Sequence, residues 1–178
     1  MQKHRLSSVQ FCKKKQNRIF TQEYSNIQKL TISSIMIALY CVIMYFTQSI
    51  SFGPYQIRIA TSLYALSYLY PFLVLPLGIA NLLSNTLGGL GVIDILGGCM
   101  VGIITSYLIT FIYKFKMPTW MSIFPIILIP GTIVPIWLSL INSLPYGVLV
   151  VSLCIGQIIP GIVGVVLINA LAKVQKYK

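Results

Sequence analysis

Few side chains in the apolar part of this chain can do chemistry, and most of those are amides. Five polar residues stand within or beside long apolar runs: Arg58, Asn81, Asn85, Asp94 and Gln157. Such groups can bind a small polar ligand through hydrogen bonds, but they contain no nucleophile with an adjacent base. An ionisable residue at membrane depth is costly, so its presence suggests a function. The five residues are therefore our candidate binding site.

The sequence lacks the usual catalytic and metal-binding arrangements. Its single histidine, His4, stands in a basic leader, and its only acids are Glu23 and Asp94. The four cysteines contain no CxxC pair, so neither a metal site nor a disulfide framework is indicated. The glycines at 88–91 lack the GxxxxGK[ST] context of a phosphate loop. We expect no enzyme activity, no cofactor and no metal.

Composition places these residues in a membrane protein. The chain is 57% hydrophobic and 8% charged, whereas a soluble domain is about 25% charged. The net charge is +11, and seven of the thirteen cations precede residue 30. A nucleic-acid-binding tail would need aromatic residues or a partner domain for specificity. We favour a positive-inside signal, supplemented by attraction to lipid headgroups, and expect no nucleic-acid partner.

Glycine and proline breaks divide the chain. We predict a basic cytoplasmic tail over residues 1–30, becoming helical near Ser25, a transmembrane domain over 31–172, and a cytoplasmic tail over 173–178. The predicted fold is an all-α membrane protein with six spans, at about 31–50, 59–70, 72–87, 92–113, 120–141 and 146–172. The second and third are short for a core of about 30 Å. Short spans are tolerated where they line a cavity, and they often mark a substrate site.

Charge parity sets the predicted topology. The N-terminus, the pair Lys114 and Lys116, and the C-terminal lysines should all be cytoplasmic, which requires an even number of spans between neighbouring groups. Residues 51–58, 87–92 and 142–146 then form outer loops. The alternative is two long spans before Lys114 and four in total.

In the six-span topology the five polar residues converge on an outward-facing cavity. Asn81 and Asn85 lie in the outer half of one helix, Asp94 begins the next, and Gln157 lies roughly 16 Å into the last helix. Arg58, in the first outer loop, could pair with Asp94. Such a cavity suits a small, polar, flat or neutral ligand. Candidates for stacking on it are Tyr55, Tyr64, Tyr68, Tyr146 and Trp137.

Each candidate also has a purely structural interpretation. Arg58 can anchor the loop at the membrane interface with its charge among the headgroups. Asp94 can interact with the dipole at a helix N-terminus, and the amides can join helices. Ser34 and Ala38 form a small-xxx-small pattern that lets another helix approach closely. Pro160 is expected to kink the last helix.

Several of these segments resemble the QueT family. Residues 50–58 (ISFGPYQIR) resemble its ISFGPxQxR signature, residues 90–98 (LGVIDILGG) resemble its LGxxD-xxxG segment, and Asn81 matches an asparagine upstream. These proteins are substrate-binding S components of energy-coupling factor (ECF) transporters linked to queuosine precursors. Ser34 and Ala38 resemble the AxxxA motif that docks on the transmembrane coupling subunit. The resemblance covers about residues 28–172.

The resemblance implies partners and a task. It predicts a bacterial cell-membrane protein that takes a small metabolite from outside and works with a transmembrane coupling subunit and two ATPases. Two residues depart from the pattern: Thr61 and Gln157 stand where the family usually has acids. The departures reduce charge complementarity to a cationic 7-deazaguanine, so the ligand is a neutral relative or another metabolite. A non-transporting membrane scaffold remains an alternative. A secondary carrier fits less well, because no internal repeat or midplane acid is evident.

Overall fold

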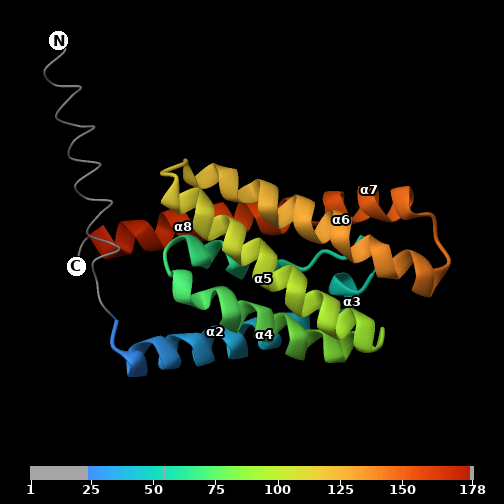
Figure 1. Cartoon of the computed structure of the whole chain (residues 1–178), viewed down its shortest axis with the longest axis horizontal. Helices are drawn as coiled ribbons and strands as arrows, with labels where there is room; N and C mark the ends of the chain where they lie inside the picture. The colour runs from blue at the N-terminus through green and yellow to red at the C-terminus, as the bar shows by residue number, and fades with distance from the viewer. Residues whose placement is uncertain (1–23, 54, 177–178) are drawn as a thin grey trace, which may run out of the picture.

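The computed structural model describes residues 24–53 and 55–176, and within them every regular element is helical (Figure 1). This agrees with the predicted all-α class. Residues 1–23 of the predicted tail, with His4, Glu23 and Cys12, lie outside the described residues, as do Pro54, Tyr177 and Lys178.

The first helix begins at a capping signal. Ser25 caps α2 (Asn26–Phe46): its Oγ accepts from the Gln28 backbone N–H at 3.3 Å, and its own N–H donates to Gln28 Oε1 at 3.0 Å. This reciprocal pair is a capping box. After Thr47 the chain forms the short helix α3 (Gln48–Ser51). The helix thus begins earlier than the predicted span 31–50, because its first turn is set by the cap rather than by hydropathy.

Within the described residues, five helical stretches are long and apolar enough to span a membrane: Asn26–Phe46, Pro71–Gly88, Val92–Lys114, Thr119–Asn142 and Tyr146–Val174. The elements after α3 are η1 (Ile59–Tyr68), η2 (Pro71–Leu73), α4 (Val74–Asn85), η3 (Thr86–Gly88), α5 (Val92–Lys114), η4 (Thr119–Ser122), α6 (Ile123–Asn142), α7 (Tyr146–Gly156) and α8 (Ile158–Lys176). Five of the six predicted spans correspond to these stretches.

The remaining predicted span, 59–70, is a different kind of element. It contains η1, a 3₁₀ helix of ten residues, which at about 2.0 Å per residue extends roughly 20 Å. Every residue from Ala60 to Tyr68 is buried. The segment packs against α2, α4, α5, α6 and α8, and it returns the chain from the end near α3 to the end where α4 begins (Figure 1). Its neighbours therefore shield it from the surface of the bundle.

The breaks between helices gather at two ends of the molecule. The α4–α5 and α6–α7 connections lie at one end, at the right of Figure 1; the beginning of α2, the α5–α6 connection and the end of α8 lie at the other. Lys29, Lys114, Lys116 and Lys173 belong to this second end and are exposed. The grouping matches the predicted loop parity, while the orientation across the membrane stays a prediction.

The buried apolar residues form two clusters. The larger is centred on η1 and includes Tyr40, Tyr64 and Leu77. The smaller joins α5, α6 and α7 through residues that include Val101, Val134 and Leu153. Large apolar side chains such as Phe46 and Leu140, 81% and 82% exposed, cover the outside, as expected for a surface facing lipid.

The last span is divided into two helices close to Pro160, the residue at which the sequence predicted a kink. Proline has no N–H to donate four residues back, so the carbonyl of Gly156 loses its helical partner. The structure ends α7 at Gly156 and begins α8 at Ile158, with Gln157 at φ −85° and ψ −4° between them. The interruption places Gln157 in the interior, where it is 2% exposed.

Candidate ligand-binding site

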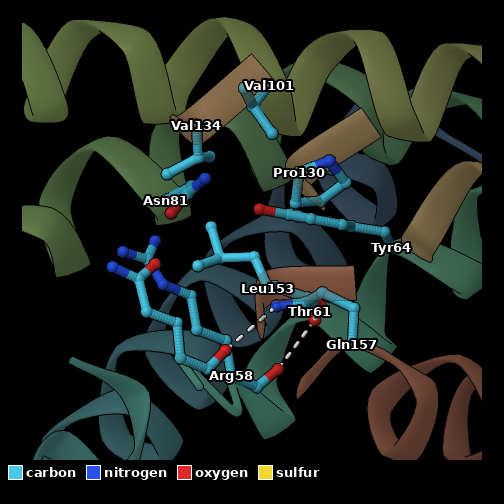
Figure 2. Close-up of a pocket in the computed structure, with 10 residues that line it drawn as sticks. Arg58, Thr61, Tyr64, Asn81, Val101, Pro130, Val134, Leu153 and Gln157 are labelled. Carbon is cyan, nitrogen blue, oxygen red and sulfur yellow. Dashed lines mark hydrogen bonds between the residues drawn. The ribbon is translucent and has the colours of Figure 1, made fainter. Parts of the chain in front are cut away.

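A small internal cavity lies where the two apolar clusters meet. Its apolar wall consists of Val101, Pro130, Val134 and Leu153. Its polar lining consists of Gln56, Arg58, Thr61, Tyr64, Asn81 and Gln157. Figure 2 shows the Arg58 guanidinium, the Asn81 amide and the Tyr64 hydroxyl directed toward the same region, with Leu153 between them and the Thr61–Gln157 pair.

The cavity is nearly closed. It offers about 10 Å³ to the centre of a water-sized sphere, which is room for about one water molecule. Ligand pockets for small molecules are typically about 300–1,000 Å³. A metabolite therefore fits only after the lining side chains or the segment that carries them move apart.

Arg58 is the charged group of this lining. Its Nη1 donates to Asn85 Oδ1 at 2.9 Å, and its guanidinium carbon lies 4.9 Å from the centre of the Phe52 ring. Its Nε and Nη2 are buried and have no hydrogen-bond partner among the described residues. Because the side chain is 4% exposed, the structure does not support the interpretation of Arg58 as an interfacial anchor with its charge in the headgroups.

Asp94 does not pair with Arg58, contrary to the suggested ion pair. Asn85 lies between them: its Nδ2 donates to the backbone carbonyl of Asp94 at 2.8 Å. The Asp94 carboxylate accepts at Oδ1 from Trp137 Nε1 at 2.9 Å, whereas Oδ2 is buried without a partner in the described part of the chain. Asp94 also lies in the first turn of α5, where the helix dipole favours an acid. The structure is therefore consistent with the structural interpretation of Asp94.

Asn81 connects the cavity to a pair of tyrosines. Its Nδ2 donates to the Gly98 carbonyl at 2.6 Å, and its Oδ1 accepts from the Tyr40 hydroxyl at 3.4 Å. The Tyr40 and Tyr64 hydroxyls lie 3.1 Å apart. Gly98 permits this approach of α4 to α5, because a Cβ there would collide with the side-chain amide of Asn85.

Thr61 and Gln157 contact each other directly. The Thr61 hydroxyl lies 2.8 Å from Gln157 Oε1 and 2.7 Å from the Arg58 carbonyl oxygen. Gln157 Nε2 donates to the Gln56 carbonyl at 3.2 Å (Figure 2). Beside it, Gly156 lies against the Tyr55 backbone so closely that a Cβ would overlap the carbonyl. The first loop is thus held on the α7–α8 junction.

The predicted site residues fall into two groups. Arg58, Asn81 and Gln157 line the cavity, whereas Asn85 and Asp94 lie behind Arg58. Among the five aromatic residues suggested for stacking, Tyr64 lines it. The others lie elsewhere: Trp137 bonds to Asp94, Tyr68 to the Met117 carbonyl and Tyr146 to the Thr132 carbonyl, and Tyr55 is exposed.

Sequence reasoning missed Gln56, Tyr40 and Pro130. Gln56 could have been found, because it is a fixed letter of the quoted loop motif. Tyr40 and Pro130 carry no such signal, since their place depends on how α2 and α6 pack. Ser34 and Ala38 lie on the exposed side of α2, away from the cavity. Within the described ranges, no three His, Cys, Asp or Glu side chains gather to hold a metal ion.

These features define an all-helical, multi-pass membrane protein with a polar cavity enclosed among its helices. The family model described as QueT transporter matches residues 30–173. The chain belongs to the QueT transporter family, a family of ECF transporter S components, in agreement with the resemblance found in the sequence. It is a family of transport components rather than enzymes, and its members generally work with ECF transporter subunits. No curated protein and no solved structure matched the chain.

Proposed function

We propose that this chain is the substrate-binding subunit of an ECF-type importer and captures a queuosine precursor or related 7-deazapurine from outside the cell. The observation that carries the proposal is Arg58, buried at the cavity with two unpartnered N–H donor groups among the described residues. Burying a charge without enough partners costs several kcal/mol. A ligand that accepts hydrogen bonds from these donors would offset that cost.

A 7-deazapurine suits the remaining lining. A planar heterocycle presents both acceptors and donors at its edge, and the cavity offers amides and hydroxyls from Asn81, Tyr64 and Gln157. The apolar residues Val101, Val134 and Leu153 can contact the ring faces. Ligand sites commonly combine such apolar walls with a few placed polar groups.

Access to the cavity requires the first loop to move. Gln56 and Arg58 line the cavity from this loop, and the loop rests on Gly156 and the Gln157 amide. Gln56 has a positive φ of 43°, a conformation that costs a non-glycine residue roughly 1 kcal/mol or more. We propose that release of the Gln157–Gln56 contact opens the site toward the outside.

Energy and partners come from other chains in this proposal. Ser34 and Ala38 are exposed on α2, where small side chains let a partner helix approach closely. They would dock the chain on a transmembrane coupling subunit bound to two ATPases. The lysine-bearing end of the bundle would face the cytoplasm of a bacterial cell, with the N-terminus inside.

Binding to the purified full chain in lipid nanodiscs tests the proposal. Isothermal titration with 7-deazaguanine bases should give saturable binding at one site per chain. Arg58→Met should weaken it at least about 100-fold, as expected for losing charged hydrogen bonds. Lys114→Met, which removes an exposed cation at the other end, should leave it unchanged. Absence of saturable binding would contradict the proposal and favour the scaffold alternative.

A further inference from the structure

The charge distribution around the cavity is one-sided. Among the described residues that line it, Arg58 is the single charged side chain, and the others are amides, hydroxyls or apolar groups. Among the described residues, no carboxylate forms a salt bridge with Arg58, and its guanidinium donates to the neutral amide of Asn85. Arg58 therefore brings a positive charge to the cavity that no other lining side chain offsets, and low dielectric surroundings strengthen its effect on a ligand.

Thr61 and Gln157, across the cavity from Arg58, do not supply a negative charge to balance the guanidinium. Thr61 and Gln157 satisfy each other, and Gln157 Nε2 also holds the Gln56 carbonyl. This last contact needs a donor: a carboxylate at position 157 would place a negative oxygen against that carbonyl oxygen. The closed arrangement of the loop is thus built around an uncharged amide, and a ligand that enters meets no counter-charge here.

Asp94 is the other charged side chain buried in the described structure. It does not line the cavity, and its carboxylate is oriented by Trp137 on α6. Its link toward Arg58 passes through its backbone carbonyl and Asn85 rather than through its charge. In this geometry Asp94 is not available to a cation placed against Thr61 and Gln157.

We propose that the cavity selects an uncharged, acceptor-bearing 7-deazapurine and rejects the counterpart that carries a protonated amine. The inference rests on the proposed function and names the substrate class of the same site. Arg58 supplies N–H donors from Nε and Nη2 to an acceptor atom on the ligand. Thr61 and Gln157 determine specificity, since at their positions an acid would supply the counter-charge for a cation.

A matched pair of probes tests the selection: 7-deazaguanine carrying either a neutral nitrile or a protonated aminomethyl group on carbon 7. Titration of the full chain in nanodiscs near neutral pH should show the nitrile binding at least about 100-fold more tightly, since unfavourable charge juxtaposition costs several kcal/mol. Equal or tighter binding of the aminomethyl probe would overturn the inference and leave the proposed function standing. Binding of neither probe would overturn both.

Variants then locate the selection. Gln157→Glu should reduce the preference for the nitrile at least about tenfold, even if the loss of the Gln56 contact weakens both probes, because the ratio is the readout. Thr61→Asp places an acid in the same region from η1 and should also reduce the preference for the nitrile. Asn142→Asp makes the same amide-to-acid change at an exposed position and should leave the ratio unchanged. An unchanged ratio of the two affinities in folded Gln157→Glu and Thr61→Asp would overturn the assignment. Tight binding of the aminomethyl probe to the unsubstituted protein, lost in Asp94→Asn, would also overturn it.

Discussion

Arg58 donates from Nη1 to Oδ1 of Asn85 over 2.9 Å. Asn85 is itself fixed, because its Nδ2 donates to the α5 backbone at the Asp94 carbonyl. The guanidinium is also placed over the Phe52 ring. The cation is therefore oriented by α4 and α5 before a ligand arrives, which is the preorganisation that a selective site requires.

Replacing Asn85 by leucine should destabilise the protein. Among the described residues, the change leaves the buried Arg58 guanidinium without its hydrogen bond to a side chain, and hydrogen bonds to charged groups contribute about 1.5–3 kcal/mol. We expect a loss of about 2–3 kcal/mol in the free energy of unfolding, measured by denaturant titration in detergent. Asn142→Leu at an exposed position is the control. Equal stability of the two variants would contradict the role of Asn85.

Replacing Trp137 by phenylalanine should lower the free energy of unfolding, because the buried Asp94 carboxylate loses a hydrogen bond. It removes the N–H that bonds Asp94 Oδ1, and Oδ2 already lacks a partner in the described structure. An unsatisfied buried group costs about 1–3 kcal/mol, more when it is charged. The loss should shrink when Asp94 is already leucine, which a double-mutant cycle measures. The control Trp120→Phe, at a half-exposed position, should cost little stability. Additive losses of unfolding free energy for the substitutions at 94 and 137 would contradict the coupling.

Adding a methyl group at Gly156 should disturb the loop. A Cβ there would overlap the Tyr55 carbonyl, a backbone atom that yields only if the loop shifts. We expect Gly156→Ala to weaken ligand binding at least about tenfold, the equivalent of the 1–3 kcal/mol typical of overpacking. At Gly147, in the same helix, no described atom beyond its chain neighbours and its own helix backbone lies within 4 Å of the added Cβ. Gly147→Ala should keep affinity and gain up to about 1 kcal/mol of stability. Similar affinities for both variants would contradict the prediction.

Enlarging Ala38 should separate docking from binding. The residue is exposed on α2 and does not line the cavity, so Ala38→Leu should leave ligand affinity unchanged. A partner helix could then no longer approach closely, so co-purification with the coupling subunit should fall at least about tenfold. Ala170→Leu makes the same change on an exposed face of α8 and should keep the complex. Retention of the complex in Ala38→Leu would remove α2 from the interface.

The sequence predicted the helical class, and it singled out three residues that line the cavity, because its signals are local. Breaks at Gly53, Lys116 and Pro145 mark where the chain turns, and an arginine or amide in an apolar run is conspicuous. The contacts among these groups were not predictable. That Asn85 would separate Arg58 from Asp94 depends on the close approach of α4 to α5 at Gly98.

The segment 59–68 shows the same limit for secondary structure. Its residues are apolar enough to suggest a membrane span, but every residue from Ala60 to Tyr68 is buried among the other helices. The segment adopts a 3₁₀ conformation while packed against α2, α4, α5, α6 and α8, contacts that local sequence does not reveal. Thr61 thereby reaches Gln157, a contact across the fold.

The burial of η1 separates two kinds of constraint on this protein. The outer helices must satisfy the bilayer, so a polar substitution on them is penalised by the lipid itself. The side chains of an enclosed segment are constrained by packing against the surrounding helices and by contact with a ligand in the cavity. A substitution at a position such as Thr61 can therefore change which ligand binds without changing the lipid-facing surface. Relatives with different ligands are then expected to differ within η1 rather than on the outer helices.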